Sequence, residues 1–246
     1  MINLALSIVV GALVSLGIHL AGFGWFAAFA PGVLLMVGAY VLLARRTASM
    51  VQKLGEQVQG QLSTAPRTEK ERDAMLDRAI KTLEQGFDLG RWQFFIGQAI
   101  HGQVGMLLYM KKDAANAVPH LEKAMGREWM AKSMLGCIHF TAKNVDAMKA
   151  AFEKAVDGGK KEALAWAAYA WCLENSKKHD DAIAVASRAV TENPSDEKLK
   201  KLQNQLQNGK RLKMNAFEPG WWQFGLEKPP VEMPRPQMRF ARGRRG

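Results

Sequence analysis

The chain has very little cysteine, and its first 44 residues contain no Asp, Glu, Lys or Arg. Among 246 residues the only cysteines are Cys137 and Cys172. They fall in two separate segments that are predicted to be helical. This pattern favours small buried side chains over a disulfide, and it fits a reducing compartment.

Sequence signatures of catalysis are also missing. The chain has no GxxxxGK[ST] phosphate loop, and its five histidines are not spaced as metal ligands. Cys137 and His139 are two residues apart, so on a helix they point in different directions and do not converge on one ion. No serine or cysteine has a recognisable base and orienting acid beside it. We therefore predict no enzymatic activity, cofactor, metal or small-molecule substrate.

The absence of charge over residues 1–44 indicates a membrane segment. A helix of about 20 apolar residues spans a bilayer, and this run is twice as long. Gly22, Gly24 and Pro31 interrupt its centre. Residues 1–46 are thus predicted to form a transmembrane hairpin, with spans at about 3–22 and 26–44. Arg45 and Arg46 then place both ends of the chain on the cytoplasmic side.

A cleaved signal peptide is the alternative for this segment. Such peptides normally begin with a basic region and have a shorter apolar core. The chain begins Met-Ile-Asn, without a basic residue, which favours the hairpin. His19 lies within the first span. It has no second ionisable residue as a partner there, so we expect it to pack against Trp25 or the turn, not to mark an ion pathway.

The hairpin is predicted to lead into a juxtamembrane stalk at residues 47–65. Val51, Leu54, Val58 and Leu62 recur at three and four residues, which predicts a helix that leaves the membrane with one apolar stripe. Pro66 and the acidic residues behind it mark a new helix at about 67–86. Residues 66–97 are interpreted as an N-terminal capping helix and turn, or as half of a degenerate repeat.

A further helix is predicted to begin at Arg91 and to run into the repeats. It would be longer than a repeat helix and would carry Trp92, Phe94 and Phe95 near its start. Aromatic side chains are more often buried than exposed, so we expect these three to pack in the core, against the helix at 67–86. The alternative is that they face the membrane or a partner.

Residues 98–194 repeat one pattern three times. Aligned with itself, the segment places Val104-Gly105, Leu135-Gly136 and Tyr169-Ala170 in register. The units begin near Gln98, Trp129 and Ala163. Periods in the low thirties with two helices a unit are typical of a stacked-repeat solenoid. The predicted fold class is therefore all-α.

The repeated residues resemble the tetratricopeptide repeat (TPR), whose pattern runs Trp, Leu-Gly, Tyr, Ala, Phe, Ala, Pro. The matching residues are Gly105, Ala117 and Ala124 in the first unit, Leu135, Gly136, Phe152 and Ala155 in the second, and Trp166, Ala182, Ala189 and Pro194 in the third. The resemblance implies a protein-binding scaffold, because many unrelated partners use this fold.

In this family the first helix of each hairpin lines a concave face. Carried onto this chain, the resemblance predicts a partner-binding groove that includes Met106, Tyr109, Met110, Phe140, Trp171 and Asn175. The lysine and asparagine pattern that clamps a peptide carboxylate is missing. A surface rich in methionine and aromatic residues suits an apolar or helical segment of a protein. The alternative is that part of this stripe belongs to the core.

The end of the chain changes character after a predicted capping helix at residues 195–214. Residues 215–246 hold five of the nine prolines, which excludes a continuous helix and favours an extended form. Trp221, Trp222 and Phe224 are expected to dock on the solenoid, because free they would expose a large apolar area. Residues 209–246 carry nine basic and three acidic side chains, a net +6. The arginine-rich end is expected to stay mobile and to lie in solvent or against anionic lipid headgroups.

These features predict a membrane-anchored cytoplasmic adaptor that binds a protein partner through its groove. Two alternatives remain: a structural subunit of a membrane assembly, and a contact with nucleic acid or the ribosome through the basic tail. The second is not favoured, since only Phe240 stands among the terminal arginines.

Overall fold

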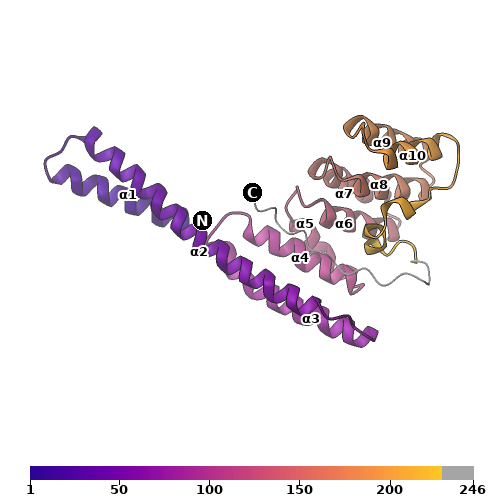
Figure 1. Cartoon of the computed structure of the whole chain (residues 1–246), viewed down its shortest axis with the longest axis horizontal. Helices are drawn as coiled ribbons and strands as arrows, with labels where there is room; N and C mark the ends of the chain where they lie inside the picture. Colours follow the sequence, from indigo (N-terminus) through magenta and orange to yellow (C-terminus); the bar gives the residue numbers. More distant parts are fainter. Residues whose placement is uncertain (229–246) are drawn as a thin grey trace. The chain divides into compact units, whose positions relative to one another are not determined.

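The computed structural model describes residues 1–228 and is all-helical over this range (Figure 1). The tail residues 229–246, with their arginines, lie outside the described residues. The chain divides into two compact units at Ile100 and His101. Unit 1 begins at Met1, and unit 2 holds the repeats.

Unit 1 opens with a helical hairpin of α1 (Ile2–Leu20) and α2 (Trp25–Leu62). Gly22 takes a φ of +95° in the connecting turn, a value that glycine adopts without steric strain. Both helices are long and apolar enough to cross a membrane, by length and composition alone. Large apolar side chains point outward along them, among them Leu20, Phe26 and Leu34 at 77%, 98% and 74% exposure.

The two hairpin helices meet along a seam of small and polar residues. A Cβ on Gly32 would lie 1.9 Å from Ser15 Oγ and 2.8 Å from the Gly11 carbonyl oxygen, so only glycine allows this approach. Towards the start of α1, Asn3 Nδ2 donates a buried hydrogen bond of 2.9 Å to Thr47 Oγ1. Close backbone packing with side-chain hydrogen bonds is how helices associate where water does not drive them together.

The structure confirms the position expected for His19. Its ring stacks on Trp25 with 3.9 Å between ring centroids, and its Nδ1 lies 3.0 Å from the Phe23 carbonyl oxygen. His19 is thus part of the turn that joins the two helices.

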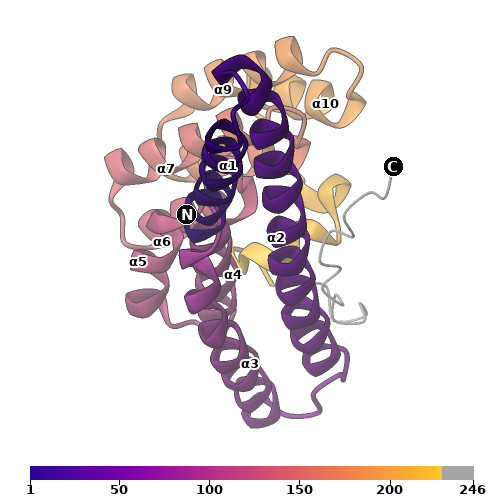
Figure 2. The same ribbon diagram turned by 90° about the vertical axis from the view of Figure 1, so that its left-hand side faces the viewer.

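α2 continues without a break through the predicted stalk to Leu62, and α3 (Glu69–Glu84) runs back along its second half (Figures 1 and 2). Thr68 caps α3 by accepting a hydrogen bond from the Glu71 amide. Gln61 Nε2 donates to Thr82 Oγ1 at 3.0 Å. The predicted capping helix therefore pairs with α2 in unit 1.

The prediction for residues 91–95 was wrong. A 3₁₀ helix, η1 (Gln85–Arg91), is followed by a tight turn, and the next helix, α4 (Ile96–Met110), starts five residues later than expected. Phe95 has a φ of +67°, which an α-helix does not accommodate. Trp92, Phe94 and Phe95 are 41%, 40% and 62% exposed, so they do not lie in the core.

The three predicted helical hairpins lie in unit 2, except that α4, the first helix of the first hairpin, has its residues 96–100 in unit 1. The others are α5 (Ala114–Lys123), α6 (Trp129–Thr141), α7 (Val145–Gly158), α8 (Ala163–Asn175) and α9 (His179–Glu192). α6 and α8 begin at the predicted residues, and α4 begins two residues before Gln98. Within each hairpin the turn uses one lysine with positive φ, at Lys112, Lys143 and Lys177.

Glycines at positions that match the TPR pattern allow the two helices of a hairpin to pack closely. A Cβ on Gly136 would lie 2.6 Å from the Phe152 ring, and one on Gly105 would lie 2.8 Å from the Leu121 side chain. Phe152 then stacks on Tyr169 of the next hairpin, with 5.2 Å between centroids and 8° between planes. The core of unit 2 therefore connects one hairpin to the next.

The end of unit 2 is folded more than the sequence suggested. α10 (Glu197–Gln207) is capped by Asp196, and Leu199, Leu202 and Leu206 are buried beneath it. The expected extended form was wrong for the described part of the tail. Residues beyond α10 form two short 3₁₀ helices, η2 (Met214–Phe217) and η3 (Gly220–Phe224).

Candidate protein-binding surface

The first helices of the three hairpins, α4, α6 and α8, carry the residues predicted to line a groove. Phe140 on α6 meets Trp171 on α8 edge to face, with 5.5 Å between ring centroids. The six predicted groove residues differ in exposure: Met106, Tyr109, Met110 and Phe140 are half-buried, Asn175 is exposed, and Trp171 is 9% exposed.

The described tail contacts two of these residues, Trp171 and Tyr109. Trp221 packs edge to face against Trp171 with 5.3 Å between centroids, and Phe224 extends the cluster at 6.1 Å from Trp221. Gly220 passes so close to α8 that a Cβ there would lie 2.7 Å from Leu164. Both Trp221 and Phe224 are 1% exposed. Four rings from α6, α8 and η3 thus form one continuous aromatic cluster.

Polar contacts fix the position of the tail. The Tyr109 hydroxyl donates a hydrogen bond to the Phe224 carbonyl oxygen, which links α4 to η3. Burial raises the pKa of Tyr109 far above its usual value, so the hydroxyl stays protonated and able to donate. Trp221 Nε1 donates to Glu227 Oε2 at 2.9 Å, and Glu227 Oε1 is 3.8 Å from the Arg211 guanidinium.

Contact with the tail reduces the surface of the predicted groove residues that a partner could reach. Trp171 is covered by Trp221, so in this arrangement it contributes to packing and is not open to another protein. Phe140, Met106 and Met110 keep part of their surface exposed. Trp222 is half-buried, and its indole N–H has no hydrogen-bond partner within the described part of the chain.

The two cysteines lie beneath this surface as free, buried thiols, in agreement with the prediction. Burial is the main cause that raises the pKa of the Cys172 thiol, and hydrogen bonding to Cys137 adds to it. Thiols of this kind are unreactive because the thiolate is the nucleophile. Within residues 1–228, no group of three or more His, Cys, Asp or Glu side chains is placed to hold a metal ion.

Two charged residues at the start of α6 were not singled out from the sequence. Lys132 is 3% exposed, and its ammonium donates to the Leu121 and Glu122 carbonyl oxygens at 2.8 and 2.9 Å. It thus caps the end of α5 from the next hairpin. Glu128 lies against Gly102, and its Oε2 is buried without a hydrogen-bond partner in the described structure.

Glu128 should make stability depend on pH. Burial raises its pKa to about 7, although Lys132 and Arg127 act in the opposite direction. Between its unfolded pKa and about 7 the folded state binds more protons at this group, so the free energy of unfolding falls as pH rises through that range. We expect Glu128→Gln to be more stabilising at pH 8 than at pH 5. The difference should be about 1–2 kcal/mol after allowance for partial exposure.

Urea unfolding of both chains at the two pH values measures this difference. Glu122→Gln, on the exposed surface of α5, is the matched control and should show no such dependence. An equal effect of Glu128→Gln at both pH values would contradict the assignment.

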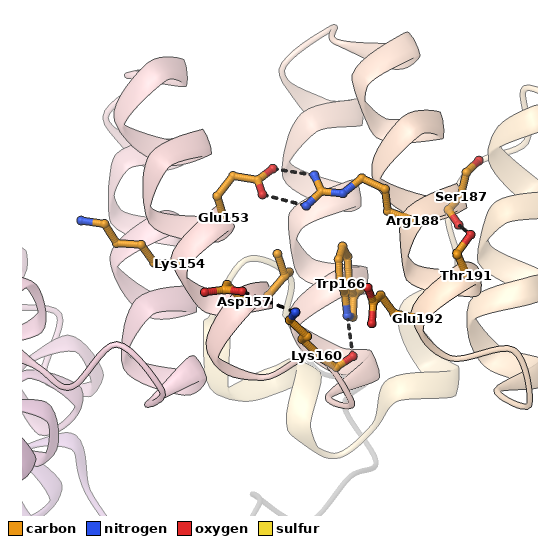
Figure 3. Close-up of a pocket in the computed structure, with 10 residues that line it drawn as sticks. Glu153, Lys154, Asp157, Lys160, Trp166, Ser187, Arg188, Thr191 and Glu192 are labelled. Atoms are coloured by element: carbon orange, nitrogen blue, oxygen red, sulfur yellow. Dashed lines mark hydrogen bonds and ion pairs between the residues drawn. The ribbon is translucent and has the colours of Figure 1, made fainter.

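A second concave region, a cleft of about 630 Å³, lies among α7, α8 and α9 (Figure 3). The Glu153 carboxylate binds the Arg188 guanidinium through two hydrogen bonds of 2.8 and 2.9 Å. The guanidinium stands 5.4 Å above the Trp166 ring, and the Tyr169 hydroxyl donates to Glu153 at 3.1 Å.

The charged groups at the centre of this cleft satisfy one another. The hydrogen bonds from Arg188 are the main cause that lowers the pKa of Glu153, and the same bonds raise the pKa of Arg188. Neither group is poised to exchange a proton near neutral pH. The cleft therefore connects the second and third hairpins and is a weaker candidate for ligand binding than the aromatic surface.

Comparison with known proteins agrees with the repeat architecture. Residues 131–157, which cover most of α6 and α7, match the tetratricopeptide repeat family. No curated protein and no solved structure matches the chain.

Proposed function

We propose that this tetratricopeptide-repeat protein is a membrane-anchored adaptor, with its solenoid in the cytoplasm and a protein partner bound across α4, α6 and α8. Repeats of this family generally act as non-enzymatic protein-binding scaffolds. The observation that best supports the proposal is the pairing of an N-terminal apolar hairpin with a repeat unit whose first helices share one aromatic surface.

The hairpin supports membrane anchoring through its exposed surface and its internal packing. Outward-facing residues such as Phe26 and Leu34 would leave a large apolar area in water. Lipid covers such a surface, and the small-residue seam provides packing that does not depend on water. Arg45 and Arg46 at the end of the apolar run favour a cytoplasmic position for everything that follows.

The tail suggests which segments the surface binds. η3 carries Trp221 and Phe224, three residues apart, and Trp221 packs on Trp171 of α8. A partner segment with aromatic side chains at helical spacing has the same chemistry. Since Tyr109 and Trp171 are already engaged by η3, a partner that uses them must displace residues 221–224.

Phe140 offers the most direct test, because it is half-buried and not covered as Trp171 is. We expect Phe140→Ala to weaken partner binding by about 1–4 kcal/mol, the range of an interface anchor. The first measurement is the amount of partner recovered with the protein after crosslinking in cells and detergent extraction. Once the partner is identified, titrating each variant with it gives the change in binding free energy. Ala184→Leu, on the exposed surface of α9, is the control and should bind normally. If Phe140→Ala lowers folding stability by the same amount and binding only in proportion, its role is structural.

A structural subunit of a membrane assembly is the second candidate. It is favoured by the deep burial of Trp221 and Phe224, because a surface filled by the protein's own tail needs no exchangeable partner. A stable complex of fixed stoichiometry, unaffected by Phe140→Ala, would favour this function over the adaptor.

A further inference from the structure

The loop between η1 and α4 presents three aromatic side chains to solvent. Trp92, Phe94 and Phe95 are 41%, 40% and 62% exposed. The rings of Phe94 and Phe95 lie 6.3 Å apart, so the two side chains form one apolar patch. A cluster of exposed aromatic side chains in a short turn commonly marks a contact surface.

Hydrogen bonds hold this loop at the first residues of α1. The N-terminal ammonium of Met1 donates to the Arg91 carbonyl oxygen at 2.8 Å, and the backbone N–H of Asn3 donates to the Trp92 carbonyl oxygen at 3.2 Å. The loop backbone therefore lies level with the end of α1 where the charge-free segment begins.

Thr47 of α2 lies at the same level, because its side chain accepts a hydrogen bond from the Asn3 side chain. Thr47 follows Arg45 and Arg46 directly, and these are the first charged side chains of the sequence. α3 and η1 return the chain along α2 to this point, and Gly86 of η1 packs against Leu54. The loop thus lies where the hairpin passes from apolar to polar surroundings.

Side chains around the loop fit an interface with anionic lipid. Arg45 and Arg46 supply positive charge at this level, whereas Arg91 is paired with Asp88 at 3.6 Å. The three rings supply apolar area. Tryptophan and other aromatic residues concentrate at the boundary between headgroups and acyl chains, and basic residues attract anionic headgroups there.

We propose that Trp92, Phe94 and Phe95 insert into the boundary between headgroups and acyl chains of the leaflet at which α1 begins. This inference rests on the proposed membrane anchoring by α1 and α2. It adds a second attachment, in the chain segment between the hairpin and the repeats. The two attachments together fix unit 1 at a defined depth, because a helical hairpin alone can tilt and shift in the bilayer.

The test uses the full chain in vesicles of phosphatidylcholine and phosphatidylserine. A short environment-sensitive fluorophore is attached to Phe95→Cys, and Cys137 and Cys172 are both 0% exposed and so stay unlabelled. Leu34→Cys, within the second span, and Lys70→Cys, at the far end of α3, are labelled in the same way as controls. Nitroxide groups placed high or low on the lipid acyl chains then quench each fluorophore according to its depth.

We expect the label at residue 95 to be quenched several-fold more by the nitroxide near the headgroups than by the nitroxide deep in the acyl chains. The label at residue 34 should show the reverse order, and the label at residue 70 should be quenched by neither. Adding Trp92→Ser and Phe94→Ser should reduce quenching at residue 95 to the level of residue 70. Both side chains are exposed, so circular dichroism should show an unchanged fold.

Two results would overturn the proposal in different ways. If residue 34 is quenched and residue 95 is not, the hairpin spans the membrane and the loop does not enter it, whether it lies in water or against protein. If residue 34 is not quenched, the hairpin does not enter the membrane, and the proposed anchoring fails together with this inference.

Discussion

Replacing Trp221 with alanine is expected to lower the free energy of unfolding of unit 2 by about 3–5 kcal/mol, the usual range for removing a buried large aromatic side chain. Trp221 is 1% exposed and packs edge to face against both Trp171 and Phe224. Its loss would leave a cavity at the centre of the aromatic cluster. It would also remove the hydrogen bond from its indole to Glu227. Thermal unfolding followed by circular dichroism measures the change.

Trp222→Ala is the matched control, because Trp222 is half-buried and its indole N–H has no partner in the described structure. Its effect should be clearly smaller. If the two substitutions lower the melting temperature equally, or if neither does, η3 is not packed on α8. Tryptophan emission provides a second readout, since exposure of Trp171 should shift its emission to longer wavelength.

Deleting residues 1–46 should move the chain from the membrane pellet to the soluble fraction after carbonate extraction. The deletion removes the charge-free segment and leaves α3 paired with the second half of α2. It also removes the hydrogen bonds from Met1 and Asn3 to residues 91 and 92. The freed chain should still unfold cooperatively, because the core of unit 2 includes none of the deleted residues.

Two arginine substitutions test membrane anchoring in the full-length chain. Arginine at the centre of a membrane span costs about 2.5–3.5 kcal/mol on insertion scales. Leu13→Arg combined with Leu34→Arg should therefore release a large share of the protein. Met50→Arg, on an exposed position beyond the apolar run, is the control and should stay in the pellet. A wild-type chain that carbonate alone extracts would contradict membrane anchoring.

The repeat architecture was predictable because its signals are local and recur. The self-alignment predicted the starts of α6 and α8 at Trp129 and Ala163. Gly136 and Phe152 matched the family pattern because a glycine on one helix admits the ring of the next. The hairpin was predictable from the absence of charge. The glycines at 11, 17, 22, 32 and 38 have a spacing that suits close helix packing, but the sequence does not show that Gly11 and Gly32 are the pair in contact.

The failures have identifiable physical causes. Trp92, Phe94 and Phe95 were expected in the core by burial frequency alone, but the positive φ of Phe95 ends the predicted helix and turns these side chains outward. In the tail, proline content predicted an extended chain, although apolar residues recur three residues apart, at Met214 and Phe217 in η2 and at Trp221 and Phe224 in η3, and all four are buried. That apolar spacing was the signal available in the sequence.

The roles of the polar residues in the repeats could not be predicted, because they depend on contacts between hairpins. Glu153 and Arg188 are 35 residues apart, close to one repeat period, so neighbouring second helices bring them together. Lys132 caps a helix that ends in the preceding hairpin. Neither role follows from the local sequence, because the partner lies on a different repeat.

A protein partner is proposed to bind across α4, α6 and α8 in competition with the tail. The most direct measurement is photo-crosslinking in intact cells from a reactive residue at Phe140, with and without Tyr109→Phe. Removing the hydroxyl deletes the hydrogen bond to the Phe224 carbonyl oxygen and should weaken tail binding by about 0.5–1.5 kcal/mol. We expect one defined protein adduct in the membrane fraction, and no adduct from a reactive residue at Ala184. In Tyr109→Phe the adduct yield should rise about two- to tenfold, which is what that energy allows. No protein adduct from Phe140 in either chain, or a yield that Tyr109→Phe leaves unchanged, would contradict this proposal.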